Sequence, residues 1–129
     1  MIVLEVTQGI AAGRAFELQG ELITLGRSPD NRVVLDDRHV SGAHARIVNG
    51  ADGVILEDLR STNGTSVVRR GERLELGPGR SAVALQTDDV IELGSGDAVT
   101  RMVVKIPEEA DDARVVSIRR LDEIEPAAA

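Results

Sequence analysis

The chain has 129 residues, a net charge of −7, no cysteine, and Phe16 as its single Phe, Tyr or Trp residue. The acidic charge and the lack of stacking rings argue against a nucleic-acid binder, and the lack of cysteine excludes disulfides and thiolate metal ligands. No apolar run approaches the ~20 residues that cross a membrane. The N-terminal segment has no basic region followed by a long apolar stretch, so we expect a cytoplasmic protein.

Residues 1–106 are dominated by short runs of β-branched and aliphatic residues with Gly, Asn, Asp or Pro between them. At the N-terminus, Ile2, Leu4 and Val6 alternate with polar or smaller neighbours, which is typical of a half-buried strand. No stretch keeps a helical period for three turns. The pattern therefore predicts an all-β sandwich. The predicted strands cover residues 2–7, 16–19, 22–25, 32–35, 43–48, 54–59, 65–69, 82–85, 89–93 and 99–106.

Residues 107–129 differ from the rest of the chain. They begin with an acidic segment that we expect to be a solvated linker. Apolar residues then recur every third position over 115–124, which predicts a short amphipathic helix. We expect this tail to join the domain to another part of a larger multidomain protein; a frayed C-terminus is the alternative.

Three predicted loops carry small polar or basic residues between apolar strands: residues 25–28 (Leu-Gly-Arg-Ser), 40–45 (Val-Ser-Gly-Ala-His-Ala) and 58–65 (Asp-Leu-Arg-Ser-Thr-Asn-Gly-Thr). Gly26 is expected to permit an unusual backbone turn just before Arg27. Hydroxyl, amide and guanidinium groups are the donors that bind a phosphate dianion. The loops therefore point to recognition of a phosphorylated ligand.

The order and spacing of Gly26-Arg27, Ser41-x-x-His44 and Ser61-Thr62-Asn63-Gly64-Thr65 resemble the forkhead-associated (FHA) domain. The resemblance covers residues 1–106. It implies a sandwich of about eleven strands in two sheets, whose loops at one end bind a phosphothreonine-containing protein or peptide.

Site residues follow from the same resemblance. Arg27 would pair with the phosphate, Ser41 would donate its hydroxyl to a phosphate oxygen, Thr62 would contact the phosphate, and Asn63 would bond the peptide backbone. Four residues would support them: Gly26, His44, Ser61 and Gly64. His44 would tie the binding loops together, and Gly64 would allow the turn after Asn63.

The sequence also departs from the family pattern. A basic residue often follows the motif serine, but here that residue is Gly42. Arg38, Arg60 and Arg69 are candidates to supply the missing charge. Two further interpretations of single residues stay open: Arg27 could pair with Asp30 or Asp58 as an ordinary surface arginine, and Ser61 could be a turn residue.

The function we expect is a non-catalytic, phosphothreonine-dependent binding module in Ser/Thr-kinase signalling. No cofactor, metal ion, nucleic acid or membrane is expected as a partner. The sequence has no nucleophile elbow, which argues against an enzyme, and no third ligand near His39 and His44, which argues against a metal site. The alternative is a phospho-independent interaction or dimerisation module on the same sandwich, which an exposed apolar sheet face would favour.

Overall fold

The structure is a computed structural model, which describes residues 1–96 and 98–107. These residues form eleven strands and no helix, so the predicted all-β class is confirmed. The strands are β1 (Ile2–Gln8), β2 (Ala15–Leu18), β3 (Leu22–Gly26), β4 (Val33–Val34), β5 (Ala45–Gly50), β6 (Gly53–Asp58), β7 (Thr65–Arg69), β8 (Glu72–Leu76), β9 (Ala82–Ala84), β10 (Val90–Ser95) and β11 (Ala98–Lys105).

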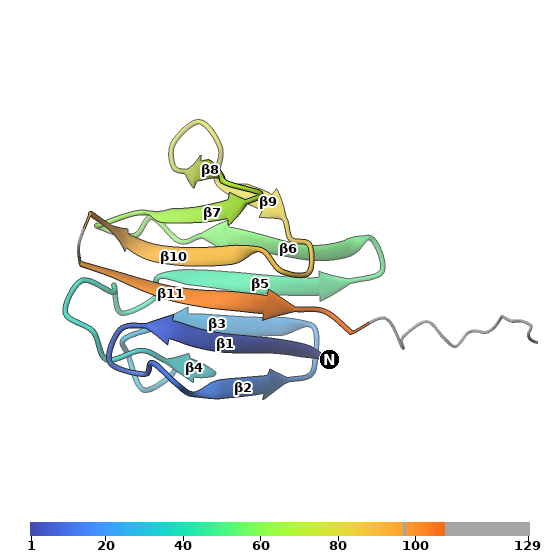
Figure 1. Ribbon diagram of the computed structural model, residues 1–129, viewed down its shortest axis with the longest axis horizontal. Helices are drawn as coiled ribbons and strands as arrows, with labels where there is room; N and C mark the ends of the chain where they lie inside the picture. The colour runs from blue at the N-terminus through green and yellow to red at the C-terminus, as the bar shows by residue number, and fades with distance from the viewer. Residues whose placement is uncertain (97, 108–129) are drawn as a thin grey trace, which may run out of the picture.

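Two sheets pack face to face (Figure 1). The first has six strands in the order β2-β1-β11-β10-β7-β8, and the second has five in the order β4-β3-β5-β6-β9. All neighbouring strands run antiparallel except β3 and β4, which are parallel. The sandwich predicted from the turn spacing is therefore the observed architecture.

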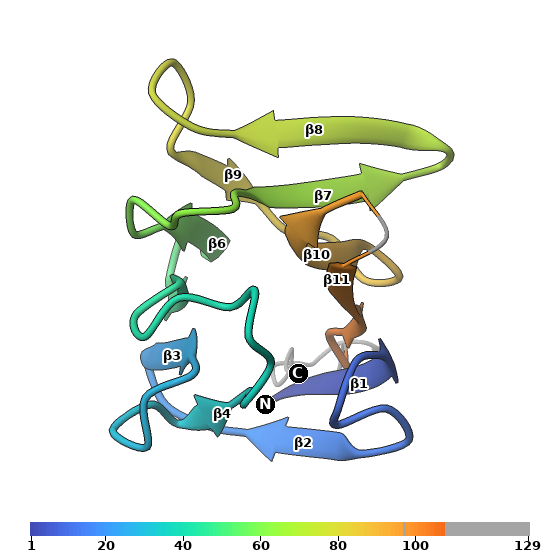
Figure 2. The same ribbon diagram turned by 90° about the vertical axis from the view of Figure 1, so that its left-hand side faces the viewer.

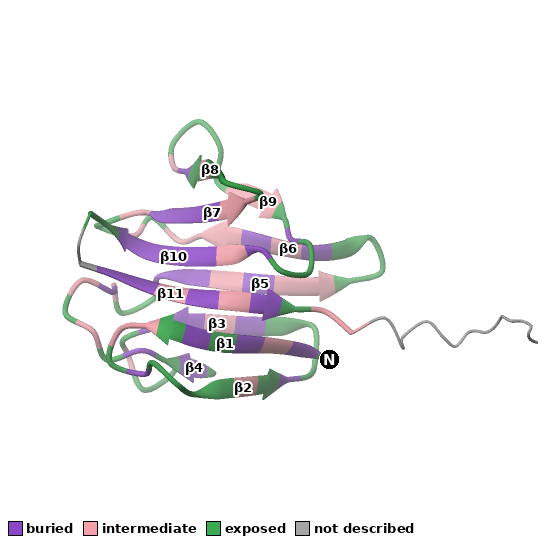
Figure 3. Cartoon of the chain, viewed as in Figure 1, coloured by how far each residue is buried: buried purple, intermediate pink, exposed green. Residues whose placement is uncertain are grey.

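The core lies between the two sheets, and the period of two in each strand decides which side chains enter it. In β1, Ile2, Leu4 and Val6 are buried, whereas Glu5 and Thr7 on the other face are exposed. Each fully buried aliphatic side chain contributes roughly 1.5–3 kcal/mol to folding. Figure 3 shows buried and partly buried residues following one another along β11, whereas β10 is buried over most of its length. This core fixes the strand ends from which the loops emerge.

Ten of the eleven strands coincide with predicted runs, and β8 was missed. β8 has the sequence Glu-Arg-Leu-Glu-Leu and lies at the edge of the six-stranded sheet, where only its last residue, Leu76, is buried. A strand with one partner and a mostly exposed surface needs little apolar sequence, so the pattern carries a weak signal. The expected helix over 115–124, like most of the expected acidic linker, lies outside the described residues. Within those residues, no helix has the length and apolar character to cross a membrane.

One end of the sandwich collects the loops singled out in the sequence. The β3–β4, β4–β5 and β6–β7 loops all emerge there, beside the β8–β9 loop (Figure 2). Segments that are far apart in the chain thus lie at the same end.

Candidate functional site

Backbone hydrogen bonds join the β3–β4 loop to the β4–β5 loop. The Arg27 amide donates to the Ser41 carbonyl at 2.9 Å, and the Ser28 amide donates to the Gly42 carbonyl at 3.2 Å. The Asn31 side-chain amide adds bonds to the carbonyls of Gly42 (2.7 Å) and Ser28 (2.9 Å). Arg27 and Ser41 are therefore held beside each other by main-chain geometry, independently of their side chains.

Gly26 is needed because of a close approach, and this corrects the sequence-based expectation of an unusual turn. Its φ is not positive, unlike that of Gly64 (φ 91°). A Cβ at position 26 would lie 2.2 Å from the Gly42 carbonyl oxygen and 2.7 Å from Nδ2 of Asn31. Any larger residue would push the β4–β5 loop away from the β3–β4 loop.

The His44 ring connects the β4–β5 loop to the β6–β7 loop. Its Nδ1 accepts a hydrogen bond from the Ser41 amide at 3.0 Å, so Nε2 carries the proton and donates to the Gly64 carbonyl at 2.9 Å. The side chain is fully buried, and burial lowers its pKa, outweighing the Gly64 bond and the nearby Asp58 charge. His44 is thus a neutral structural bridge whose two ring nitrogens are both satisfied.

Asp58, at the end of β6, organises the start of the β6–β7 loop. Its carboxylate accepts bonds from the hydroxyls of Ser61 (2.5 Å) and Thr65 (2.6 Å) and from the Ser61 amide (3.2 Å). The Ser61 hydroxyl oxygen in turn accepts the Gly64 amide at 3.1 Å. Burial alone would raise the pKa of Asp58, but these hydrogen bonds lower it below its usual value. Asp58 and Ser61 are therefore committed to loop structure, and Asp58 does not pair with Arg27.

The four predicted binding side chains keep donors available. The Ser41 Oγ accepts the Thr62 amide at 3.0 Å, which leaves its hydroxyl hydrogen free to donate outward. Asn63 uses one amide hydrogen on the His39 carbonyl at 2.9 Å and has a second one left. The Arg27 guanidinium donates one hydrogen bond to the Arg38 carbonyl at 3.3 Å. Arg27, Thr62 and Asn63 are exposed, so these donors face solvent.

A second polar cluster supports the β4–β5 loop and was not found from the sequence. Asp37 accepts the Ile10 amide at 3.0 Å and the Thr100 hydroxyl at 2.5 Å. Because the hydroxyl hydrogen of Thr100 goes to Asp37, its oxygen accepts from Nε2 of His39 at 2.9 Å. Asp37 lies 27 positions from Ile10 and 63 from Thr100, and His39 lies 61 positions from Thr100. No local sequence pattern could therefore have paired them.

The three auxiliary arginines proposed from the sequence are placed differently. Arg38 and Arg60 are exposed, and none of the ion pairs in residues 1–96 and 98–107 includes Arg27, Arg38 or Arg60. Arg69 instead donates two bonds to the Asp89 carboxylate, at 2.8 and 2.9 Å, and one to the Ala84 carbonyl. Its guanidinium is therefore engaged within the fold, at the opposite end of β7 from Thr65, and we leave it out of the proposed site.

The exposed large hydrophobic side chains of the described residues come from four different segments. They are Met1 at the N-terminus, Ile10 in the β1–β2 loop, Leu22 in β3 and Val34 in β4. No two of them share a strand or loop. This distribution gives no specific support to the alternative of a dimerisation module.

Comparisons with known proteins agree with this geometry. The sequence pattern of the FHA domain matches residues 23–94, which is more than half of the chain. The transcriptional regulatory protein EmbR of Mycobacterium tuberculosis is 42% identical over 84 residues, covering 65% of this chain and 20% of EmbR. The chain thus corresponds to about a fifth of that relative's length.

Solved structures show the same fold. M. tuberculosis EmbR in complex with a low-affinity phosphopeptide superposes with a TM-score of 0.63 at 36% identity, covering 81% of this chain and 24% of that one. An FHA domain solved for the study of phosphothreonine-dependent interactions has a TM-score of 0.64 at 28% identity, covering 82% and 96%. The fold, the loops and the sequence match together define a β-sandwich binding module. The chain belongs to the FHA domain family.

Proposed function

We propose that this chain binds phosphothreonine-containing proteins or peptides through the end of the sandwich that carries Arg27, Ser41, Thr62 and Asn63. Its role would be that of a non-catalytic module in Ser/Thr-kinase signalling, recruiting a phosphorylated partner. The observation that carries the proposal is the convergence of these four residues, whose remaining donors face solvent with no carboxylate of the described residues paired to Arg27.

The physical basis is capture of a dianion by preformed donors. A phosphothreonine carries about −1.5 to −2 charge and three acceptor oxygens. Each charge-assisted hydrogen bond contributes roughly 1.5–3 kcal/mol. The net charge of −7 does not oppose this strongly, because exposed charges farther than about 8 Å are screened at physiological salt. The loops are already joined by hydrogen bonds, so little conformational entropy is lost in ordering them.

The test is a calorimetric titration of the protein with a phosphothreonine peptide library and its unphosphorylated counterpart. We expect binding only to the phosphorylated members, and weaker binding when phosphoserine replaces phosphothreonine, since a buried methyl group contributes roughly 0.8 kcal/mol. Equal binding to phosphorylated and unphosphorylated peptides would overturn the proposal.

A further inference from the structure

A groove with a volume of ≈ 1080 Å³ is lined by two residues of the proposed phosphothreonine site, Thr62 and Asn63. Its lining includes Thr62 and Asn63 from the β6–β7 loop, Leu76 at the end of β8 and Pro78 in the β8–β9 loop. Figure 2 shows the β6–β7 and β8–β9 loops on the same side of the same end of the sandwich. A peptide anchored at Thr62 and Asn63 would therefore have this groove directly beside its flanking residues.

The charged residues that line the groove differ in whether their side chains have a partner. Glu57 is paired with Arg46 at 2.5 Å, and Asp58 accepts the Ser61 and Thr65 hydroxyls. Arg60 is exposed, and its guanidinium makes no ion pair and no side-chain hydrogen bond within the described residues. Arg60 is thus the arginine of the lining that has no ion-pair partner among the described residues.

The backbone of Arg60 adds a second observation. Its φ is 58°, in the left-handed region, which costs a non-glycine residue about 1 kcal/mol relative to glycine there. Residues in strained backbone conformations cluster at active sites and ligand-binding loops. Arg70 and Asp88 also have positive φ, so a left-handed backbone does not by itself mark a binding residue. What distinguishes Arg60 is that it lines the groove next to Thr62 and Asn63.

We propose that Arg60 and this groove select phosphothreonine partners that carry an acidic residue, Asp or Glu, close to the phosphothreonine in the sequence. The inference rests on the proposed function. The flanking segment would lie in the groove between the two loops, and its carboxylate would face the Arg60 guanidinium, which presents a planar fork suited to a carboxylate.

The experiment uses a set of phosphothreonine peptides in an otherwise neutral sequence, with one aspartate placed in turn at each position before and after the phosphothreonine. We expect aspartate at one position or a small set of adjacent positions to tighten binding about three- to tenfold over the all-neutral peptide at low salt. The gain should shrink at high salt, because the pair is exposed.

Two variants separate the effect of the Arg60 side chain from the effect of its backbone conformation. Arg60→Gly relieves the left-handed strain, so it should melt at the same temperature or higher, and it should bind the aspartate-containing and the neutral phosphothreonine peptides with equal affinity. Arg60→Lys should retain most of that gain. Arg70→Gly, which changes another arginine with positive φ in the β7–β8 turn, is the matched control and should leave the gain intact.

The outcomes distinguish the two proposals. If no phosphothreonine peptide binds, the proposed function fails and this inference with it. If the neutral phosphothreonine peptide binds but aspartate has no effect at any position, the inference alone is overturned. The same conclusion follows if the gain persists in Arg60→Gly.

Discussion

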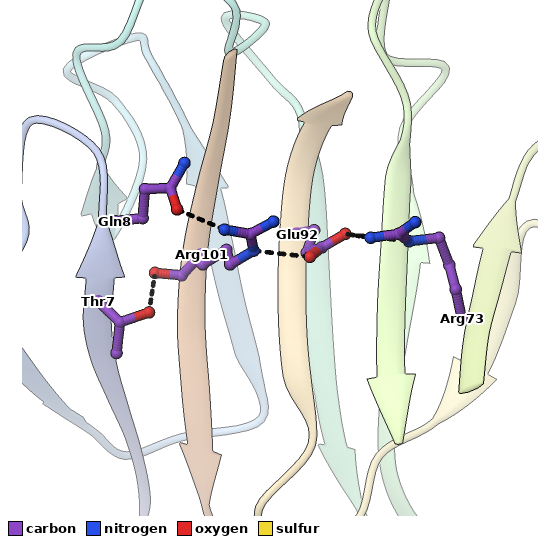
Figure 4. A network of polar contacts seen from close by, with 5 residues as sticks. All are labelled: Thr7, Gln8, Arg73, Glu92 and Arg101. Atoms are coloured by element: carbon purple, nitrogen blue, oxygen red, sulfur yellow. Dashed lines mark hydrogen bonds and ion pairs between the residues drawn. The ribbon is translucent and has the colours of Figure 1, made fainter. Parts of the chain in front are cut away.

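Arginine side chains serve two different purposes in two regions of this molecule. On the outer face of the six-stranded sheet, Arg73 and Arg101 both bond the carboxylate of Glu92, at 2.9 and 2.7 Å, and Arg101 also bonds Gln8 (Figure 4). At the loop end, Arg27 and Arg38 have no carboxylate partner among the described residues. Paired guanidinium groups join strands to each other, whereas unpaired ones at the loop end remain available to an anionic ligand.

The buried carboxylates of the sheet region are the partners of its paired arginines. Burial alone would raise the pKa of Glu92, but the bonds from Arg101 and Arg73 lower it, so the carboxylate stays charged. Asp89 is almost fully buried and holds Arg69 with both oxygens. Removing a residue from this region should therefore reduce stability, while removing one from the loop end should reduce binding.

The largest expected effect is on the sheet side of the comparison. Asp89→Ala leaves the Arg69 guanidinium without its carboxylate and the Gln86 amide without its acceptor. We expect a loss of about 3 kcal/mol in the free energy of unfolding, since breaking a buried pair leaves an uncompensated charge. Urea denaturation measures it. Phosphothreonine affinity of the remaining folded protein should match the unaltered chain, and a selective loss of affinity would contradict the division.

The second prediction concerns the loop side. Arg27→Gln should weaken binding of a phosphothreonine peptide about 30-fold, equivalent to about 2 kcal/mol, because it removes a charge-assisted bond to the phosphate. The unfolding free energy should change by less than about 0.5 kcal/mol, since the side chain is exposed.

The matched control for Arg27→Gln is Arg70→Gln, in an exposed turn that joins β7 to β8. Its affinity for the phosphothreonine peptide should stay within experimental error of the unaltered chain. If both substitutions weakened binding equally, the net charge of the protein would matter and not the position of Arg27.

A smaller effect on phosphothreonine affinity is expected when a positive charge is added to the loop end. A Cβ at position 42 would have only the Ser28 Cβ nearby, at 4.0 Å, and the residue is exposed. Gly42→Arg should therefore be accommodated and should tighten phosphothreonine binding about three- to fivefold, the size expected of an exposed pair. Gly42→Gln is the neutral control and should show no such gain in the same titration.

The smallest expected effect is a change in the pH dependence of stability. Burial lowers the pKa of His44 below its ordinary value of 6.5, so the unfolded chain takes up the proton first. The contribution of His44 to the free energy of unfolding is therefore complete above pH 6.5 and is lost as the pH falls from there through the lowered pKa of the folded state. Thermal melting from pH 8 to 5 without ligand should show this decline, and His44→Gln should have a flatter profile. A steeper profile for the variant would contradict the assignment of a neutral ring.

The parts of the fold that follow a local period could be predicted from the sequence. β1 has apolar residues at alternating positions because one of its faces is buried, and that pattern is readable without a structure. The edge strand β8 buries little and was missed for that reason. The three loops of the site were found because their polar residues interrupt apolar strands in a family-specific order.

The support of those loops could not be predicted in the same way. Asn31 and the Asp37–Thr100–His39 cluster connect residues whose proximity depends on how the two sheets pack. The role of Gly26 was also misjudged, since a close approach by the Gly42 carbonyl is a tertiary contact and has no signature within the β3–β4 loop itself. Likewise, only the structure shows that Arg69 is paired and Arg27 is not.

Nuclear magnetic resonance of the ¹⁵N-labelled protein tests the central claim most directly. On addition of a phosphothreonine peptide, the Arg27 guanidinium signal and the amide signals of Ser28, Ser41 and Thr62 should shift most, and the unphosphorylated peptide should leave them in place. Shifts centred instead on the sheet face around Glu92 and Arg101, or equal shifts with both peptides, would contradict the account.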